Sequence, residues 1–159
     1  MPFVHAIINN HSFNGRYADS IGHVDELIAI CEELVPAALS CKHTILAPGN
    51  IRFISTPPNT GQRTNLKADV LLHIQAQSCD DRAADTDTRA HHIQSALMSL
   101  LPTYSFDIWI QLGSVGWVTE FPDDDVDWSE DLTLTGAYDR AFRKVRAINE
   151  QRSNTDLYR

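Results

Sequence analysis

Four segments of this chain combine β-branched and aromatic residues with an alternation of apolar and polar positions. They are PFVHAIIN at 2–9, IRFIST at 51–56, DVLLHIQAQ at 69–77 and FDIWIQL at 106–112. Asparagine, glycine and proline flank these segments, for example at Pro57-Pro58 behind the second. Such turn formers commonly bound β-strands. The pattern therefore predicts four strands.

A helical repeat of apolar residues starts near Asp19. It comprises Ile21, Val24, Leu27, Ile28, Cys31, Leu34 and Val35. The other side of the same helix carries the acidic residues Asp25, Glu26, Glu32 and Glu33. This spacing is typical of an amphipathic helix with one face toward a core. Proline does not fit a helix interior, so Pro36 predicts that the helix kinks or ends near Val35.

A second helix is predicted between the third and fourth strands. Side chains at 85–88 can cap its beginning, and Pro102 stops it. One face carries Ala90, Ile93, Leu97, Leu100 and Leu101. Strand, helix and strand thus occur twice in succession. Two such units predict parallel pairing within each unit and an α+β fold, in which a four-stranded sheet carries both helices on one face.

Alternation along the strands indicates what the other face of the sheet presents. Toward the helices we expect Val70, Leu72, Ile74, Ile108, Ile110 and Leu112. Away from them we expect His73, Gln75, Gln77, Asp107, Trp109 and Gln111. Parallel strands are normally covered on both sides. We therefore expect copies of the same chain to cover this mixed face in a small oligomer.

The tail differs in composition from the rest of the chain. Segment 122–132, PDDDVDWSEDL, is strongly acidic, and a helical stripe follows it, made of Tyr138, Ala141, Phe142, Val145 and Ile148. Basic residues surround the stripe at Arg140, Arg143, Lys144 and Arg146. We interpret 1–121 as the main domain and 122–159 as an acidic loop and terminal helix packed on it or on a neighbouring subunit. A partner-binding role for this helix is the alternative.

Composition and charge narrow the classes of function. The 159 residues carry a net charge of −8, which argues against a dedicated nucleic-acid binder. No apolar run approaches the roughly 18 residues that span a bilayer, and no secretory signal is present at the start. Three cysteines without CxxC spacing, with Cys31 inside a helix, indicate free thiols. We expect a cytoplasmic protein.

Pro2 directly behind Met1 and two local stretches resemble the tautomerase superfamily. LLHIQAQSCDDRAADT at 71–86 looks like the strand, turn and helix start of the 5-carboxymethyl-2-hydroxymuconate isomerase and cis-3-chloroacrylic acid dehalogenase groups. IWIQLGSVGWVTEF at 108–121 is similar to the dehalogenase group, and its Val-Gly-Trp more distantly to macrophage migration inhibitory factor. The resemblance implies the tautomerase (β-α-β)2 fold, a homotrimer, and a catalytic N-terminal proline exposed by removal of Met1.

The resemblance also implies roles for individual residues. Pro2 would be the general base and acid, since an α-amino pKa near about 8 falls toward neutrality with partial burial and a neighbouring cation. Arg82 would hold a substrate carboxylate, and Glu120 would activate water. The other implied substrate-binding residues are Arg52, Gln111, Trp109 and Trp117.

Each of these residues also has an ordinary structural interpretation. Pro2 can simply open a strand, and Arg82 can be a solvated cation that neutralises Asp80, Asp81 and Asp85. Arg52 can lie at a subunit contact, Glu120 on the surface, and either tryptophan in a core or an interface.

The pattern departs from the dehalogenase group, because no histidine stands near the end of the first helix and Gln111 replaces a tyrosine. Gln111 can donate a hydrogen bond but cannot act as an acid. The first hypothesis is therefore a tautomerase that acts on a small 2-hydroxy-dienoate or 2-keto acid. The alternatives are a 3-haloacrylate dehalogenase or hydratase, with Pro2 as acid and Glu120 on water, and a non-enzymatic binding module. The seven histidines show no metal-ligand spacing, so we expect no metal and no cofactor.

Overall fold

A computed structural model shows a four-stranded sheet with the order β2-β1-β3-β4. It describes residues 1–15, 22–42, 44–57, 67–113 and 131–156. The strands are β1 (Phe3–Ile8), β2 (Arg52–Thr56), β3 (Val70–Gln77) and β4 (Phe106–Gly113). β1 pairs parallel with β2 and antiparallel with β3, and β3 pairs parallel with β4. The predicted α+β class and the parallel pairing within each strand–helix–strand unit are confirmed.

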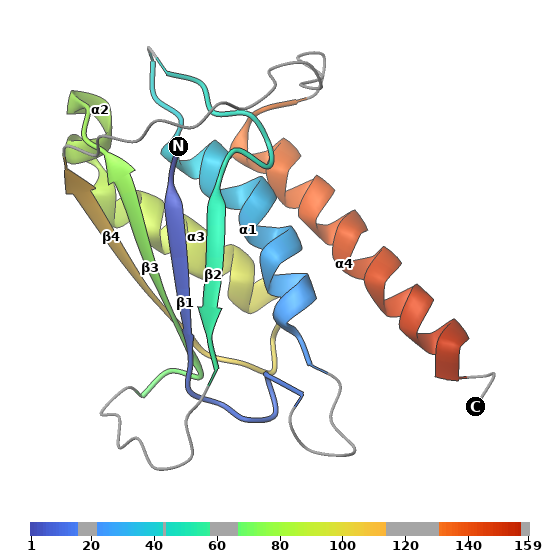
Figure 1. The fold of residues 1–159 in the computed structure, drawn as a ribbon. Coiled ribbons are helices and arrows are strands. Elements are labelled where there is room, and N and C mark those ends of the chain that lie inside the picture. The colour runs from blue at the N-terminus through green and yellow to red at the C-terminus, as the bar shows by residue number, and fades with distance from the viewer. Residues whose placement is uncertain (16–21, 43, 58–66, 114–130, 157–159) are drawn as a thin grey trace.

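Helices α1 (Val24–Leu39), α3 (Thr86–Leu100) and α4 (Leu134–Asp156) lie on one side of the sheet (Figure 1). The short α2 (Asp80–Ala84) lies at the end of the sheet where β3 ends. As the sequence predicts, Val70, Leu72 and Ile74 of β3 are buried on the side of the helices, and Ile108, Ile110 and Leu112 of β4 are partly buried against the same core. Alternate residues of β1 are also buried there. The opposite face of the sheet is open, with Trp109 58% and Ile54 48% exposed. None of the described helices is both long and apolar enough to cross a bilayer.

Of the two outcomes expected near Val35, a kink or an end of the helix, the end is not observed. Pro36 lies inside the helix, which continues to Leu39. Proline has no backbone N–H, so the carbonyl of Glu32 loses its partner within the helix. The backbone N–H of Gly49 donates to that carbonyl at 2.8 Å instead. A loop far along the chain thus supplies the hydrogen bond that the proline cannot make.

Two of the acidic residues of α1, Glu26 and Glu33, do not face solvent but lie under α4, whereas Asp25 is exposed. Glu26 is fully buried and Glu33 is 2% exposed, and two helical turns separate them. Arg140 Nε and Lys144 Nζ reach the carboxylate of Glu33 at 2.6 and 2.7 Å. Arg152, near the other end of α4, donates to Glu26.

The apolar stripe of α4 is narrower than the sequence predicts. Ala137, Ala141 and Val145 are buried, whereas Phe142 is 52% exposed. Arg140, which is 8% exposed, also lies on the buried face of α4. The terminal helix is therefore held by ion pairs as well as apolar packing. The predicted boundary at 121/122 lies outside the described residues and stays a prediction.

A network around Asp69 joins three strands at the end of the sheet where β1 ends. Its carboxylate accepts hydrogen bonds from the Ser105 N–H, the Ser105 hydroxyl and the Asn10 amide, each at 2.8 Å. Burial alone raises the pKa of Asp69, but these hydrogen bonds outweigh it and lower the pKa below its ordinary value. The carboxylate is thereby held ionised between the starts of β3 and β4.

Candidate active site at the start of the first strand

The predicted site residues Pro2, Arg52 and Gln111 lie at the same end of the sheet. At this end β1 and β2 begin, while β3 and β4 finish (Figure 1). Phe3 is in register with Arg52 on one side and Gln75 on the other, and Gln75 is in register with Gln111. Arg52, Phe3, Gln75 and Gln111 therefore form one row across the four strands, with Arg52 and Gln111 at its two ends. Pro2 directly precedes Phe3 in the chain.

At this end of the sheet, Pro2 lies on a different face from the other predicted site residues. Pro2 is buried, and its carbonyl accepts the Arg52 N–H at 2.9 Å. Successive side chains of a strand alternate between faces. Pro2 therefore shares the helix-covered face with Val4, whereas Arg52, Gln111 and Trp109 are exposed on the open face. The candidate residues therefore lie on both faces of the sheet at this end and do not line one wall of a single pocket.

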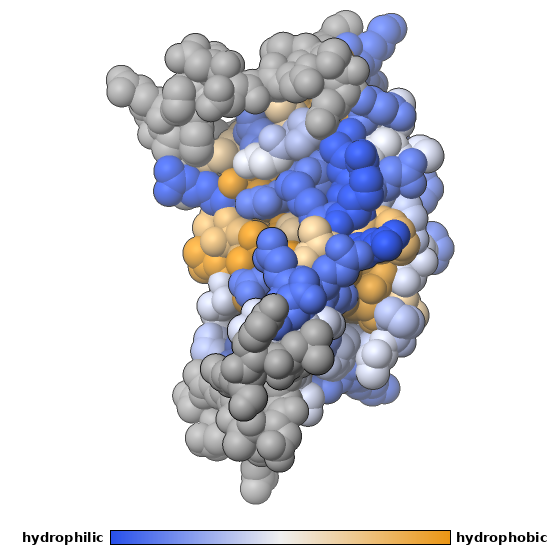
Figure 2. Space-filling view, turned by 90° about the vertical axis from the view of Figure 1, so that its right-hand side faces the viewer, coloured by the Kyte–Doolittle hydropathy of each residue, from blue (hydrophilic) through white to orange (hydrophobic). Residues whose placement is uncertain are grey.

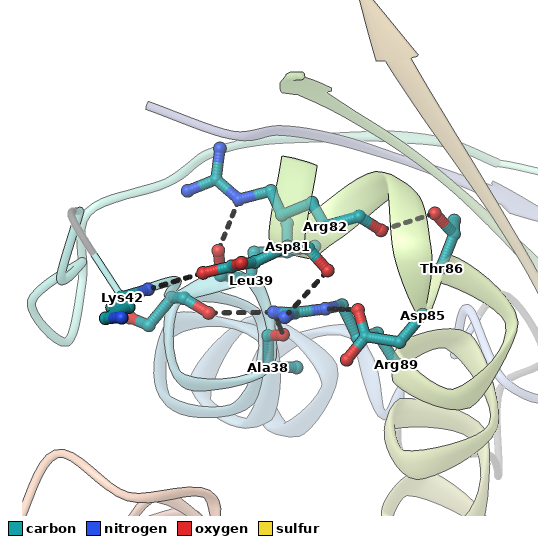
Figure 3. Close-up of polar contacts among 9 residues, drawn as sticks. Ala38, Leu39, Lys42, Asp81, Arg82, Asp85, Thr86 and Arg89 are labelled. Atoms are coloured by element: carbon teal, nitrogen blue, oxygen red, sulfur yellow. Dashed lines mark hydrogen bonds and ion pairs between the residues drawn. The ribbon is translucent and has the colours of Figure 1, made fainter. Parts of the chain in front are cut away.

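Arg82 is buried, with 4% exposure, and is not a solvated cation. Its Nε donates to the carbonyl of Leu39 at the end of α1, and its Nη1 donates to the carbonyl of Gln77 at 2.7 Å. Figure 3 shows the guanidinium directed toward Leu39 and away from Asp85. The two bonds connect α2 to the ends of α1 and β3.

The remaining nitrogen of Arg82, Nη2, is buried and has no hydrogen-bond partner within the described part of the chain. Gln77 is two positions beyond Gln75, which pairs with Phe3, so this guanidinium lies beside the beginning of β1. A buried cationic donor without a partner is costly, because its desolvation is not offset. The burial of Nη2 is therefore not offset by any of the described residues.

Arg89 also supports this end of the sheet, a role that the sequence pattern did not predict. Its Nη1 donates to the carbonyls of Ala38 and Ser40 at 2.6 and 2.7 Å (Figure 3). The last turn of α1 contains no basic residue of its own, so its terminal carbonyls need donors from elsewhere. The absence of a basic residue in the last turn of α1 is the feature of the sequence from which a donor such as Arg89 could have been predicted.

The capping role expected at the start of the second helix is not observed for Asp85. Asp85 occupies the N-cap position of α3 but makes no side-chain hydrogen bond to the backbone there. Its carboxylate pairs with Arg89 instead, at 2.5 Å. Because Arg89 is already held by the carbonyls of α1, the ion pair ties the start of α3 to α1.

Two polar pairs cross the open face of the sheet. His73 Nε2 lies 2.9 Å from Gln111 Oε1, and His5 Nε2 lies 2.7 Å from Thr56 Oγ1. The ring of His73 also stacks on Trp109, with centroids 4.8 Å apart and planes at 25°. Alternation predicts which residues share this face, but it does not predict which of them pair.

Two hollows border the helices. One, of about 510 Å³, is bordered by Cys41, Lys42, Asp81 and Arg89. The other, of about 620 Å³, lies between α3 and α4 over Leu100, Phe142 and Val145. On the side where α4 lies, Figure 2 shows apolar surface next to a hydrophilic band.

Glu120 and Trp117 lie outside the described residues, as does most of the acidic segment, so their roles stay predictions. Within the described ranges, no three His, Cys, Asp or Glu side chains are grouped to hold a metal ion.

Comparison with known proteins gives one structural match. No protein-family model matches the chain, and no curated protein sequence matches it. Among solved structures, the chain is similar to a crystal structure of 5-carboxymethyl-2-hydroxymuconate delta-isomerase, with 14% identity and a TM-score of 0.45. The match covers 77% of this chain and 89% of that one. At this level of similarity it carries no information on activity or substrate.

Proposed function

We propose that this protein is a tautomerase of small carboxylates that uses the amine of Pro2, exposed by removal of Met1, as its proton carrier. The observation that carries the proposal is the buried guanidinium of Arg82, whose Nη2 has no partner among the described residues. It lies beside the strand that Pro2 opens. A substrate carboxylate is the partner that this nitrogen is suited to accept.

The proposed tautomerisation needs one group that carries the proton, the Pro2 nitrogen. The Pro2 nitrogen takes the proton of the C2 hydroxyl of a 2-hydroxy-dienoate, and the O–H electron pair forms the C2 carbonyl. The displaced double-bond electrons take the proton back from Pro2 at C3 or C5. A positive charge nearby disfavours the protonated amine, so Arg82 supports the base form that starts the cycle.

Two residues of the open face would also contact the substrate. Arg52 offers a second guanidinium for the carboxylate, and Gln111 offers an amide N–H for the developing carbonyl oxygen. We propose that these side chains act in a homotrimer, in which neighbouring copies cover the open faces. Light scattering behind gel filtration tests this assembly, and a monomeric mass at working concentration would contradict it.

The experiment combines intact mass with enol turnover. We expect the purified chain to lack Met1, and phenylenolpyruvate to be ketonised faster than in buffer. Pro2→Ala should lower kcat/KM by about a hundredfold or more, because a positioned base commonly contributes at least that factor. Pro102→Ala is the matched control, since this exposed proline follows α3. Retention of Met1, or equal rates for wild type and Pro2→Ala, would refute the proposal.

A further inference from the structure

A row of side chains on the open face lies beside Gln111. His73 is in register with Trp109, and Gln75 with Gln111, so His73 and Gln111 are diagonal neighbours on β3 and β4. The stacked indole of Trp109 restricts the plane of the His73 imidazole. With the plane restricted, Nε2 lies 2.9 Å from the Gln111 carbonyl oxygen.

The two ends of a glutamine amide have opposite chemistry. The oxygen only accepts hydrogen bonds and the NH2 group only donates them. If His73 carries its proton on Nε2, it holds the oxygen, and the NH2 group of Gln111 faces away from the ring. If the proton is on Nδ1, Nε2 becomes an acceptor. The Gln111 amide then turns its NH2 group toward the ring, and its oxygen faces away from the ring. The tautomer of His73 thus selects a donor or an acceptor.

We infer that His73 is a positioning residue: it donates from Nε2 to Gln111 Oε1 and thereby presents the Gln111 NH2 group to the substrate. This inference rests on the proposed function, in which Gln111 donates to the carbonyl oxygen that forms during tautomerisation. Trp109 has a corresponding part, because its ring keeps the imidazole in the plane that makes the bond. His73 itself does not contact the substrate.

The chain offers a matched control on the same face. His5 is in register with His73 across β1 and β3, and its Nε2 is bonded to Thr56 rather than to Gln111. His5→Phe removes an imidazole of the same kind without touching the Gln111 amide. His73→Phe removes the donor and keeps an aromatic ring beside Trp109.

The test compares kinetics with spectroscopy. We expect His73→Phe to lower kcat/KM for phenylenolpyruvate about three- to tenfold, the range for one lost hydrogen bond, and His5→Phe to stay within about twofold. His73→Phe combined with Gln111→Ala should be no slower than Gln111→Ala alone, because both changes remove the same oriented donor.

A nitrogen-correlation NMR spectrum of the imidazoles should show a proton on Nε2 of His73, and the Gln111 NH2 resonances should shift in His73→Phe but not in His5→Phe. A proton on Nδ1, or independent multiplication of the two rate losses, would overturn the inference. If Pro2→Ala leaves turnover unchanged, the proposed function fails. The spectra then still decide whether His73 orients Gln111.

Discussion

The buried ion pair between α1 and α4 allows a quantitative prediction. Glu33 is 2% exposed at its side chain, Arg140 is 9% exposed, and their Nε–Oε2 distance is 2.6 Å. Replacing Glu33 with leucine leaves the Arg140 guanidinium buried without its carboxylate. Removing one partner of such a pair commonly costs about 3–5 kcal/mol of unfolding free energy. We expect Glu33→Leu to fall in this range.

Arg140→Met should cost less than Glu33→Leu, because Lys144 remains 2.7 Å from Glu33 and still neutralises it. The double variant Glu33→Leu/Arg140→Met replaces both charges by apolar groups of similar size. Such replacements are often neutral or stabilising. We therefore expect the double variant to be more stable than Glu33→Leu alone, with a coupling energy of about 2–3 kcal/mol.

The assay is urea unfolding at pH 7 followed by circular dichroism, with all variants measured at one protein concentration. Glu32→Gln is the control, because Glu32 is 40% exposed and lies 3.7 Å from Lys144. Exposed pairs of this kind contribute about 0–1 kcal/mol. If the double variant loses as much unfolding free energy as the two single variants together, the reasoning that Arg140 is buried because Glu33 pairs with it is refuted.

Three further predictions concern single sites. The lowered pKa of Asp69 means that its contribution to stability is present above the unfolded pKa, near about 3.9, and disappears as pH falls through the folded pKa. In Asp69→Asn the urea midpoint should therefore fall less steeply than in wild type between about pH 5 and 3. An unchanged slope of the midpoint against pH would contradict this. Gly49 has a φ of +77° and open space where a Cβ would lie, so Gly49→Ala should cost about 1 kcal/mol from backbone strain alone, measured by the same unfolding assay. Burial, with the neighbouring negative charge of Glu32, raises the pKa of the Cys31 thiol, so iodoacetamide at pH 8 should label Cys41 but spare Cys31 in the native protein, as peptide mass spectrometry would show.

Sequence patterns were sufficient for the four strands, for the faces of β3 and β4, and for the approximate place of the long helices, but not for the short α2. Residues of β3 alternate between buried and partly exposed as predicted, because a strand places successive side chains on opposite sides. Arg52 and Gln111 were placed on strands correctly, and Pro2 directly precedes the strand predicted to contain it. The register that puts the three residues at one end of the sheet required the tertiary structure.

Long-range pairing decided the features that local rules could not predict. Pro36 should end a helix by local chemistry, yet the Gly49 N–H satisfies the freed carbonyl. Glu33 is on the polar side of its helix, yet Arg140 from a distant helix covers it.

From the sequence alone came the α+β class, the strand segments and the candidate residues, since these follow from periodicity and residue type within short windows. The tertiary structure decided the burial of Arg82, the role of Arg89 and the pairing of His73 with Gln111. Each of these depends on a partner that the chain brings near only when the sheet and helices pack together.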